Sequence, residues 1–519
     1  MPQEFDYIVV GGGTAGCVIA AGLIDRTDAT VALIEAGSAS RGRRVHTPAL
    51  YPTLWGSTRD WGYATMPQPA LRSRRLAWPR GRGLGGSSAI NAMIYSLGHP
   101  HDAAAYPSGY DLEAARERLA ATIPDEWTTP PKLHPASERF LAACEAAGLA
   151  DDSADETSTQ RCTGGAHGFL RTAKAGRRLD AYSHFLRPKL EDQRLRVLSE
   201  LTIRRILFHG DRGSGVEAAV GDGEVQKLAA RHGVILCGGA IASPALLLRS
   251  GIGPQDQLRA LGVDTVAINE HVGRHLQDHL VVPLVYAADN VDSLPPIDDR
   301  DSRIRYLRNR TGPLASNLAE AGLFASLDRD HRRLVMPEAS EPPQLQVHFT
   351  PTHYLQYPLA RRWTAANTLA VTWLNPASRG EIRLDPDSGE IVIEPNYLSA
   401  LEDGPNLAAA IEVVDAFAEA FHPPGGWRER LVPRPKDGRR DWPQTAIESF
   451  AVSIYHPVGT CRMAATAGEG VVDPGFRVFG VEGLYVADAA AMPELPTGNP
   501  QGTVMANAAA AALAIADSS

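Results

Sequence analysis

The order of apolar and polar segments at the start of the chain predicts a strand, a helix and a second strand. Residues 5–10 form an apolar run, and the alanine-rich stretch 17–23 has the composition of a helix. A second apolar run, residues 30–34, ends at Glu35. Between the first strand and the helix lie residues 11–16, which have the pattern G-x-G-x-x-G. We therefore predict a strand–turn–helix–strand unit in this segment.

The glycine pattern of this turn is typical of dinucleotide-binding sites. Gly11 permits the tight turn, Gly13 lets the backbone approach a pyrophosphate, and Gly16 lets the helix pack closely on the strand. The helix N-terminus offers unpaired N–H groups and the positive end of its dipole to phosphates. Glu35, 19 positions beyond Gly16, can accept a hydrogen bond from a ribose hydroxyl and argues against a 2′-phosphate. A purely structural glycine turn is the alternative, and the motif alone does not separate FAD from NAD.

Further along the chain, the pattern predicts more strands and a second, sheet-rich region. Short apolar runs predict strands at residues 195–198, 203–208, 216–220 and 233–237. A Leu-rich helix is expected after the last of these strands. Short alternating runs between residues 343 and 397, the last of them at 391–394, predict a mostly antiparallel sheet. Residues 107–165 are polar and are expected to be irregular.

The nucleotide-binding signals therefore occupy the first third, the middle and the C-terminus of the chain. We predict an α/β fold in which a Rossmann-like nucleotide-binding domain is interleaved with a substrate domain. The substrate domain is expected to be a mostly antiparallel β-sheet flanked by helices. Residues 1–155, 192–290 and 443–519 are assigned to the nucleotide-binding domain, and residues 156–191 and 291–442 to the substrate domain.

The composition is that of a soluble enzyme with more than one domain. The 519 residues are too many for one simple core, and the net charge is −9 (51 − 60). This charge argues against binding to nucleic acid or to an anionic membrane. The five cysteines are scattered without a C-x-x-C pair, which predicts reduced thiols and no metal site. No signal peptide or membrane-spanning segment is recognised, so we expect a cytoplasmic protein.

The C-terminal part of the chain carries a second candidate site. His456 precedes Pro457 at the start of a glycine-bearing loop, and the proline keeps His456 out of helical geometry. A histidine suits general-base work because its unperturbed pKa, about 6.5, lies close to operating pH. Asn499 lies in a Gly-Asn-Pro turn, where asparagine is common for structural reasons. Either residue alone would be interpreted as structural, so a catalytic role for the two residues depends on the other motifs of the chain.

Taken in order, the motifs of the chain resemble those of the glucose–methanol–choline (GMC) oxidoreductases, a family of FAD-dependent alcohol-oxidising enzymes. The resemblance covers nearly all 519 residues. Its motifs are residues 11–16 with Glu35, 80–91, 239–254, 272–279, 312–317, 456–463 and 487–489. This resemblance, and not the first glycine motif, favours FAD over NAD as the cofactor.

The resemblance implies which residues form the active site. His456 corresponds to the family's catalytic histidine, and Asn499 to a second active-site position that is His or Asn in its members. The residues matched to FAD contacts are Gly11, Gly13, Thr14, Ala15, Gly16, Glu35, Ala36, Arg82, Gly85, Gly86, Ser87, Asn91, Ala92, Ile203, Asp488, Ala489, Asn499, Pro500 and Gln501. Ile90 stands where members with covalent FAD carry a histidine, so non-covalent FAD is expected.

The implied reaction is the oxidation of an alcohol, expected to be primary and apolar or aromatic, to the aldehyde. His456 accepts the hydroxyl proton while hydride passes to flavin N5, and Asn499 hydrogen-bonds the developing alkoxide. Either O2 or another acceptor then reoxidises the flavin. Two alternatives stay open: oxidation of a peptide-derived or protein-bound redox carrier, and a flavin-containing hydroxynitrile lyase. His348 is expected either to line the substrate side of the pocket or to be a core histidine.

Overall fold

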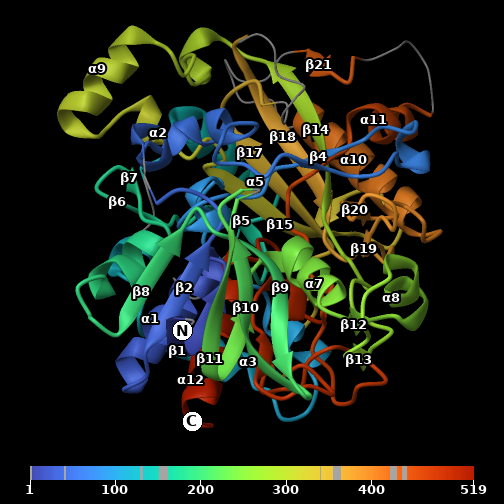
Figure 1. The fold of residues 1–519 in the computed structure, drawn as a ribbon. Helices are drawn as coiled ribbons and strands as arrows, with labels where there is room; N and C mark the ends of the chain where they lie inside the picture. The colour runs from blue at the N-terminus through green and yellow to red at the C-terminus, as the bar shows by residue number, and fades with distance from the viewer. Residues whose placement is uncertain are drawn as a thin grey trace.

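Two large β-sheets organise the chain, one mixed and one antiparallel (Figure 1). The computed structural model describes residues 3–39, 42–128, 132–150, 162–221, 223–338, 340–354, 364–420, 429–434 and 441–518. Helices pack on both sheets, so the predicted α/β class is confirmed.

The mixed sheet contains the predicted strand–helix–strand unit. Its strands are β1 (Gln3–Val10), β2 (Val31–Glu35), β8 (Leu195–Ser199), β9 (Thr202–His209), β10 (Arg212–Ala219), β11 (Val225–Leu236) and β23 (Leu484–Val486). They run in the order β8-β2-β1-β11-β10-β9, and β23 also pairs with β11. The pairings among β8, β2, β1, β11 and β23 are parallel, as in dinucleotide-binding folds, whereas β9 and β10 pair antiparallel. The strands predicted for this part of the chain are confirmed.

Strand β11 joins the distant segments of this sheet. It pairs with β1 along one edge. Along its other edge, residues 225–229 pair with β10 and residues 234–236 pair with β23. The C-terminal segment therefore returns to the centre of the sheet, close to the turn that follows β1. This return explains why nucleotide-binding signals recur far apart in the sequence.

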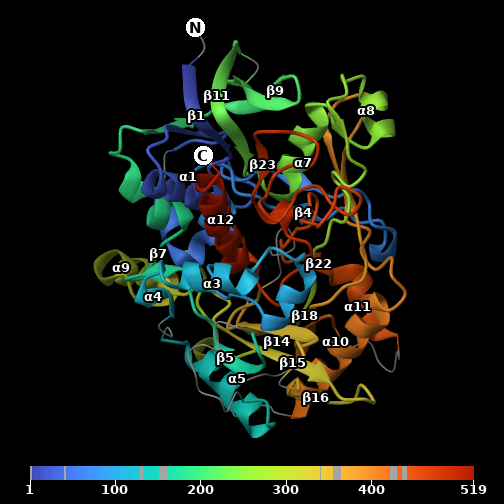
Figure 2. The ribbon, with the colours of Figure 1, turned by 90° about the horizontal axis from the view of Figure 1, so that it is seen from below.

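Two helices pack against one another beside the mixed sheet, α1 (Thr14–Arg26) and α12 (Gln501–Ala516) (Figure 2). A Cβ atom at Gly22 would lie 2.7 Å from the Cβ of Ala512, so the glycine permits this close approach. The predicted Leu-rich helix is α7 (Gly239–Arg249), which begins directly after β11. Helix α1 begins at the glycine turn, and α12 begins in the C-terminal segment that lies beside this turn. The N-termini of both helices lie at the site described below.

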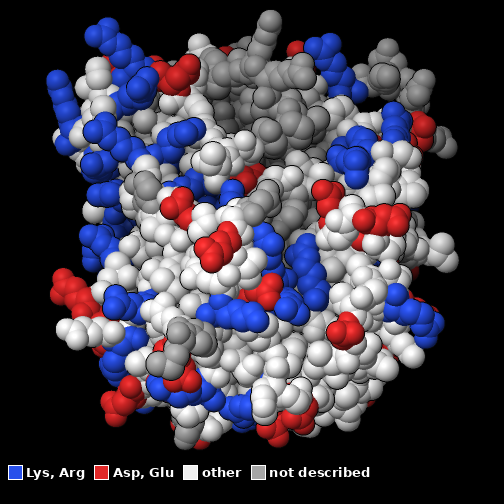
Figure 3. All heavy atoms as spheres, viewed as in Figure 1, with Lys and Arg blue, Asp and Glu red and all other residues white. Residues whose placement is uncertain are grey.

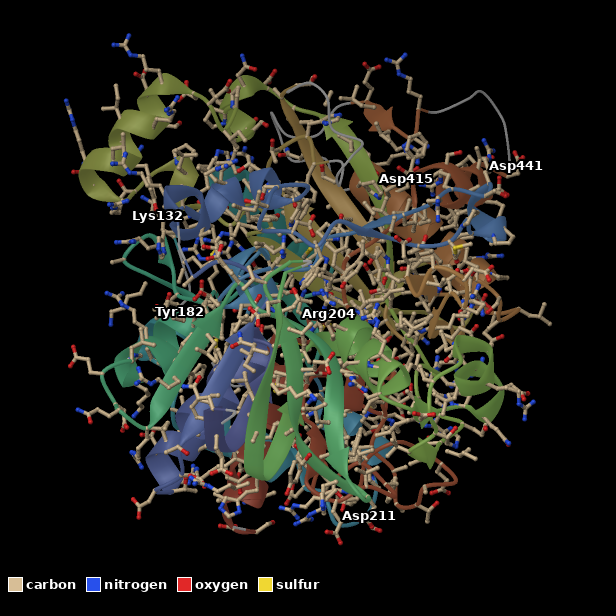
Figure 4. The ribbon with its side chains drawn as sticks, in the orientation of Figure 1. Lys132, Tyr182, Arg204, Asp211, Asp415 and Asp441 are labelled. Carbon is tan, nitrogen blue, oxygen red and sulfur yellow. The ribbon has the colours of Figure 1, made fainter. Side chains whose placement is uncertain are left out.

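The antiparallel sheet consists of β5 (Gly165–Gly168), β14 (Leu280–Ala287), β15 (Ala321–Leu327), β16 (Leu334–Val335), β17 (Leu345–Thr350), β18 (Ala366–Trp373), β21 (Arg430–Val432) and β22 (Val452–Ser453). Three helices pack on it: α5 (Pro135–Ala146), α10 (Asp403–Ala420) and α11 (Trp442–Phe450). The ring of Phe140 on α5 stacks on Phe349 of β17 with centroids 4.8 Å apart. Asp415 on α10 and Asp211, between β9 and β10, lie toward opposite ends of the molecule (Figure 4).

The region expected to be irregular contains helices α3 (Leu112–Ala120), α4 (Asp125–Thr128) and α5. The expectation for residues 107–165 was therefore wrong for these segments, and residues 151–161 lie outside the described part of the chain. The buried side chains of α3 are Leu112, Ala115, Arg116 and Leu119, which is helical spacing. Because the buried face of α3 includes an arginine, the sequence of this helix shows no continuous apolar face and was interpreted as polar.

Two details of the predicted substrate domain also need correction. Strand β14 pairs with β18 and so belongs to the antiparallel sheet, although the predicted boundary at residue 290 excluded it. Residues 391–394 form a separate hairpin, β19 (Glu381–Leu384) with β20 (Ile391–Glu394), outside the large sheet. The backbone of Ile382 donates to Gly273 O at 2.7 Å, which ties this hairpin to the connection before β14. The remaining domain boundaries stay a proposal.

Short elements connect these units: α2 (Arg43–His46), β3 (Tyr63–Ala64), β4 (Ala77–Trp78), β6 (Ala173–Lys174), β7 (Arg177–Arg178), β12 (Ile252–Gly253), α8 (Gln255–Leu261), β13 (Ala267–Ile268) and α9 (Arg300–Asn309). Helix α9 lies at the edge of the molecule, and Lys and Arg side chains gather over α9 and α2 (Figure 3). Among the described residues, no helix combines the length and the apolar character that a bilayer crossing requires.

Candidate active site

A cavity of about 720 Å³ lies among β1, β2, β11, α12 and the antiparallel sheet. It collects segments that are hundreds of residues apart, and most of the predicted site residues line it. These are Gly11, Gly13, Thr14, Ala15, Glu35, Ala36, Gly86, Ser87, Asn91, Ala92, Ile203, His456, Asp488, Ala489, Asn499, Pro500 and Gln501. Its volume lies in the upper part of the range of ligand-binding pockets, about 300–1,000 Å³.

Three predicted cofactor residues, Gly16, Arg82 and Gly85, do not line the cavity. A Cβ atom at Gly16 would lie 1.9 Å from Gly11 O, so Gly16 has the helix–strand packing role expected from the motif. Gly85 adopts a φ of 91° and donates its N–H to Gly12 O at 2.8 Å, which shapes the turn from behind. The side chain of Arg82 is exposed and lies over the ring of Trp61, outside the cavity lining, and its role as an FAD contact stays a prediction.

One end of the cavity has the properties of a dinucleotide site. Gly86 has a φ of 49°, and a Cβ atom there would lie 2.6 Å from the Cα of Gly13. The two glycine turns thus leave a bare backbone cradle that any side chain would fill. The carboxylate of Glu35 accepts hydrogen bonds from the N–H groups of Gly12, Gly37 and Gly83, each at 2.8 Å. A carboxylate offers about four lone-pair sites, so Glu35 can still accept from a ribose hydroxyl.

The other end of the cavity offers polar groups for a flavin ring. The buried Nε2 of Gln501 has no hydrogen-bond partner among the described residues, while its Oε1 accepts from Asn91 Nδ2. Arg178 holds Asn91 in turn, by donating to its Oδ1 at 2.8 Å. Helix α12 begins at Gln501, and its first-turn N–H groups face the same cavity. An unpartnered donor and a helix N-terminus suit the polar edge of a flavin, so these residues fit FAD.

Asp488 lines the cavity but already uses both carboxylate oxygens within the protein. Its Oδ2 accepts from Gly239 N at 2.7 Å and from Ser243 Oγ at 2.6 Å, and its Oδ1 accepts from Ala490 N at 2.7 Å. Burial raises the pKa of this carboxyl group. Asp488 therefore fixes the start of α7 against the end of β23, and so shapes the cavity wall.

The structure brings the two predicted catalytic residues together. The distance between His456 Nε2 and Asn499 Nδ2 is 3.2 Å. Gln346 Nε2 donates to Asn499 Oδ1 at 3.4 Å, and His348 is also hydrogen-bonded to the Asn499 side chain. The amide of Asn499 is thereby oriented with its NH2 group toward His456. His348 lines the cavity, so it belongs to the site and is not merely a core histidine.

A chain of hydrogen bonds determines which nitrogen of His456 carries its proton. His279 Nε2 lies 2.9 Å from Leu374 O, and this carbonyl can only accept, so Nε2 carries a proton. In neutral His279 the other nitrogen, Nδ1, must then accept, and it lies 3.0 Å from His456 Nδ1. His456 therefore donates from Nδ1 and carries its lone pair on Nε2, which accepts from Asn499 Nδ2 at 3.2 Å. His279 ends the motif 272–279, and no pattern in the sequence indicated its role.

The backbone of His456 is also fixed. Asp278 Oδ1 accepts from His456 N at 2.7 Å, and Asp278 Oδ2 accepts from Ser453 Oγ at 2.6 Å and from Tyr397 OH. Burial raises the pKa of Asp278 to about 6, although these hydrogen bonds oppose the shift. The residue before the histidine, Tyr455, has a φ of 69°, a strained conformation for an aromatic residue. Such strain requires a rigid surrounding, which the Asp278 bonds provide.

The electrostatics of the site keep the histidines neutral. Burial lowers the pKa of His456 well below its ordinary value, and His279, His348 and Arg80 add to this effect. Burial also lowers the pKa of His279 and of His348 to about 4. At neutral pH His456 is therefore an unprotonated base. Within the described residues, no group of three or more His, Cys, Asp or Glu is placed to hold a metal ion.

We expect acidification from about pH 7 to about pH 5 to destabilise the protein, by roughly 2 kcal/mol for each of His279 and His348. Their pKa values fall from 6.5 in the unfolded chain to about 4 in the fold, so the unfolded chain binds more protons in this window. This stability is present above pH 6.5 and is lost as the pH falls toward 4. Urea unfolding of the holoenzyme at several pH values measures it. His348→Leu should flatten the dependence, and a pH-independent midpoint over this range contradicts the account.

Comparison with known proteins agrees with this geometry. Two models described as GMC oxidoreductase match residues 5–281 and 376–508. An uncharacterized GMC-type oxidoreductase of Mycobacterium tuberculosis is 34% identical, over 96% of this chain and 97% of the relative. An alcohol dehydrogenase [acceptor] of Pseudomonas putida is 32% identical, over 95% of this chain and 92% of the relative. The crystal structure of pyridoxine 4-oxidase from Mesorbium loti has a TM-score of 0.83 and 28% identity, covering 98% of both chains.

The fold and the cavity define an FAD-dependent oxidoreductase. The chain belongs to the GMC oxidoreductase family.

We expect the FAD to be non-covalent, because the buried Ile90 that lines the cavity has no atom that can bond to the flavin. Acid precipitation of the holoenzyme should release all of the yellow cofactor into the supernatant. Flavin that stays with the precipitated protein contradicts this expectation.

Proposed function

We propose that this enzyme oxidises a primary, apolar or aromatic alcohol to the aldehyde, with FAD as its oxidant and O2 or another acceptor for reoxidation. The observation that carries the proposal is the placement of the unprotonated Nε2 of His456 3.2 Å from Asn499 Nδ2. Both groups line the same cavity that fits FAD. The relative named as an alcohol dehydrogenase supports an alcohol as the donor.

In the proposed reaction, the alcohol oxygen lies between His456 and Asn499 and replaces their mutual hydrogen bond. His456 Nε2 accepts the hydroxyl proton, and its lowered pKa keeps this nitrogen available at neutral pH. The Asn499 NH2 group donates to the oxygen as negative charge develops, and Gln346 holds the amide in that orientation. FAD, when bound, supplies the two-electron oxidant that takes the carbon-bound hydrogen with its electron pair. The alcohol thus loses one proton and one hydride, which leaves the aldehyde.

The substrate class is supported by an aromatic wall of the cavity. The rings of Tyr51 and Trp55 lie 5.4 Å apart and those of Trp55 and Tyr455 lie 5.2 Å apart, edge to face. Tyr51 OH also donates to Tyr354 OH at 3.1 Å. All of these residues line the cavity, which suits a flat, apolar substrate body. The sequence did not reveal this wall, because its members are up to 404 positions apart (455 − 51).

The proposal is tested by anaerobic mixing of the holoenzyme with a panel of alcohols while flavin absorbance is followed. Benzyl alcohol and straight-chain primary alcohols should bleach the flavin, whereas glucose should not. Admission of air then separates O2 from another acceptor by the speed of recovery. Two results contradict the proposal. One is release of aldehyde from a cyanohydrin without bleaching, which indicates a lyase. The other is bleaching only by a protein-bound redox carrier.

A further inference from the structure

We propose that the buried pair of Asp102 and Arg116 positions the catalytic turn 497–501, so that Asn499 is held at the base. This inference rests on the proposed function and assigns two residues outside the cavity. Asp102 Oδ1 accepts from Thr497 N at 3.1 Å and from Thr497 Oγ1 at 2.8 Å. Thr497 lies two positions before Asn499, and Asp102 itself does not line the cavity. Asp102 is therefore a positioning residue that acts through Thr497.

Arg116 fixes the other oxygen of this carboxylate. Asp102 Oδ2 accepts from Arg116 Nη2 at 2.7 Å and from His99 N at 2.9 Å. The Arg116 side chain has 0% exposure, and its Nη1 donates to His99 O at 2.9 Å and to Glu113 Oε1 at 2.7 Å. A buried guanidinium bound on both sides gives Asp102 little freedom to rotate. Helix α3, which carries Arg116, thus supports the turn 497–501 through Asp102.

The far side of the turn is closed by tight packing. Gly498 has a φ of 86°, and a Cβ atom there would lie 3.2 Å from the ring of Phe324. A Cβ atom at Gly502 would lie 2.0 Å from Ser96 O, and Ser96 Oγ donates to Asn499 O at 3.3 Å. The turn is therefore clamped between the 96–102 segment and the antiparallel sheet. Release of Thr497 removes the side-chain anchor two positions before Asn499, and the next anchor, Gln277 Oε1 to Leu495 N, lies four positions before it.

The alternative is that the pair only stabilises the packing of α3 on α12. Three variants separate these roles: Asp102→Asn, which is isosteric, Thr497→Val, which leaves the ion pair intact, and Asp111→Ala as the control. Asp111 caps α3 by accepting from Ala114 N at 2.9 Å, so its loss loosens the same helix without touching the turn. If Asp102→Asn does not fold, Thr497→Val still tests the role of the hydrogen bonds between Thr497 and Asp102.

The first measurement is amide hydrogen exchange of the holoenzyme, which does not depend on any substrate. The amides of residues 497–499, 501 and 502 should exchange at least about tenfold faster in Asp102→Asn and Thr497→Val, with β17 amides unchanged. The Asp111→Ala control should exchange faster in α3 and not in the turn. Unchanged exchange in the turn for both test variants overturns the proposal, whatever the enzyme proves to oxidise.

The second measurement is the anaerobic flavin reduction rate with an alcohol that bleaches the wild-type protein. Each test variant should retain FAD and reduce it about tenfold more slowly, since small misplacements at a reacting centre are costly. In the Asn499→Ala background the same substitutions should slow reduction less than about twofold, because they act through the missing amide. Fully additive losses overturn the proposal. If no alcohol bleaches the flavin, the proposed function fails and the exchange result alone decides this inference.

Discussion

Replacing His456 by alanine leaves FAD bound and slows its reduction by an alcohol at least about a hundredfold. The imidazole Nε2 of His456 lies 3.2 Å from Asn499 Nδ2 and is unprotonated at neutral pH, and its removal deprives the hydroxyl proton of this acceptor. His456→Asn, which retains a polar side chain but no basic nitrogen, should be as slow as the alanine variant. Stopped-flow absorbance of the anaerobic holoenzyme measures both rates.

The pH dependence gives this prediction a second readout. Wild-type reduction should be nearly independent of pH through neutrality and should fall only well below pH 6.5, since burial lowers the pKa of His456. The acid limb should disappear in the alanine variant, because the titrating group is gone. Flavin reduction at the wild-type rate in His456→Ala removes the histidine from the mechanism.

Replacing His279 by leucine slows flavin reduction at least about tenfold, although His279 does not line the cavity. The substitution removes the acceptor at 3.0 Å that keeps the proton of His456 on Nδ1. His456 is then free to carry its proton on Nε2, where it cannot act as a base. His279 also helps to lower the pKa of His456, so the acid limb should move toward pH 6.5 when His279 is removed.

His275→Asn is the matched control for His279→Leu. His275 lies in the same motif, but its Nε2 contacts His271 Nδ1 at 3.0 Å, away from His456. Its φ of 60° is a conformation that asparagine tolerates well. This variant should reduce flavin at the wild-type rate with an unchanged pH profile. A His279→Leu enzyme with a wild-type rate and profile contradicts the proposed proton arrangement.

The parts of the fold that follow local rules were predictable from the sequence. The strand, glycine turn and helix at residues 5–26 are contiguous, and their side-chain requirements are steric, so the motif fixed Gly11, Gly13 and Gly16 in their roles. His456 was predicted because it lies in a family motif, and Asn499 because it matches the family's second active-site position. Most of the residues matched to FAD contacts line the same cavity.

The parts that depend on long-range pairing were not predictable. His279 and His456 are 177 positions apart, and only the folded chain shows that their Nδ1 atoms meet. The buried Arg116 concealed helix α3, because its charge is satisfied in part by Asp102, 14 positions earlier, whose proximity no local pattern reveals. The aromatic wall was hidden likewise, since Tyr51 and Tyr354 meet across 303 positions.

The central claim is most directly tested by anaerobic flavin reduction with benzyl alcohol and with the same alcohol deuterated at the carbinol carbon. The account predicts that both bleach the flavin and that the deuterated alcohol does so several times more slowly, because the carbon–hydrogen bond breaks in that step. Flavin that stays oxidised with every alcohol of the panel contradicts the account.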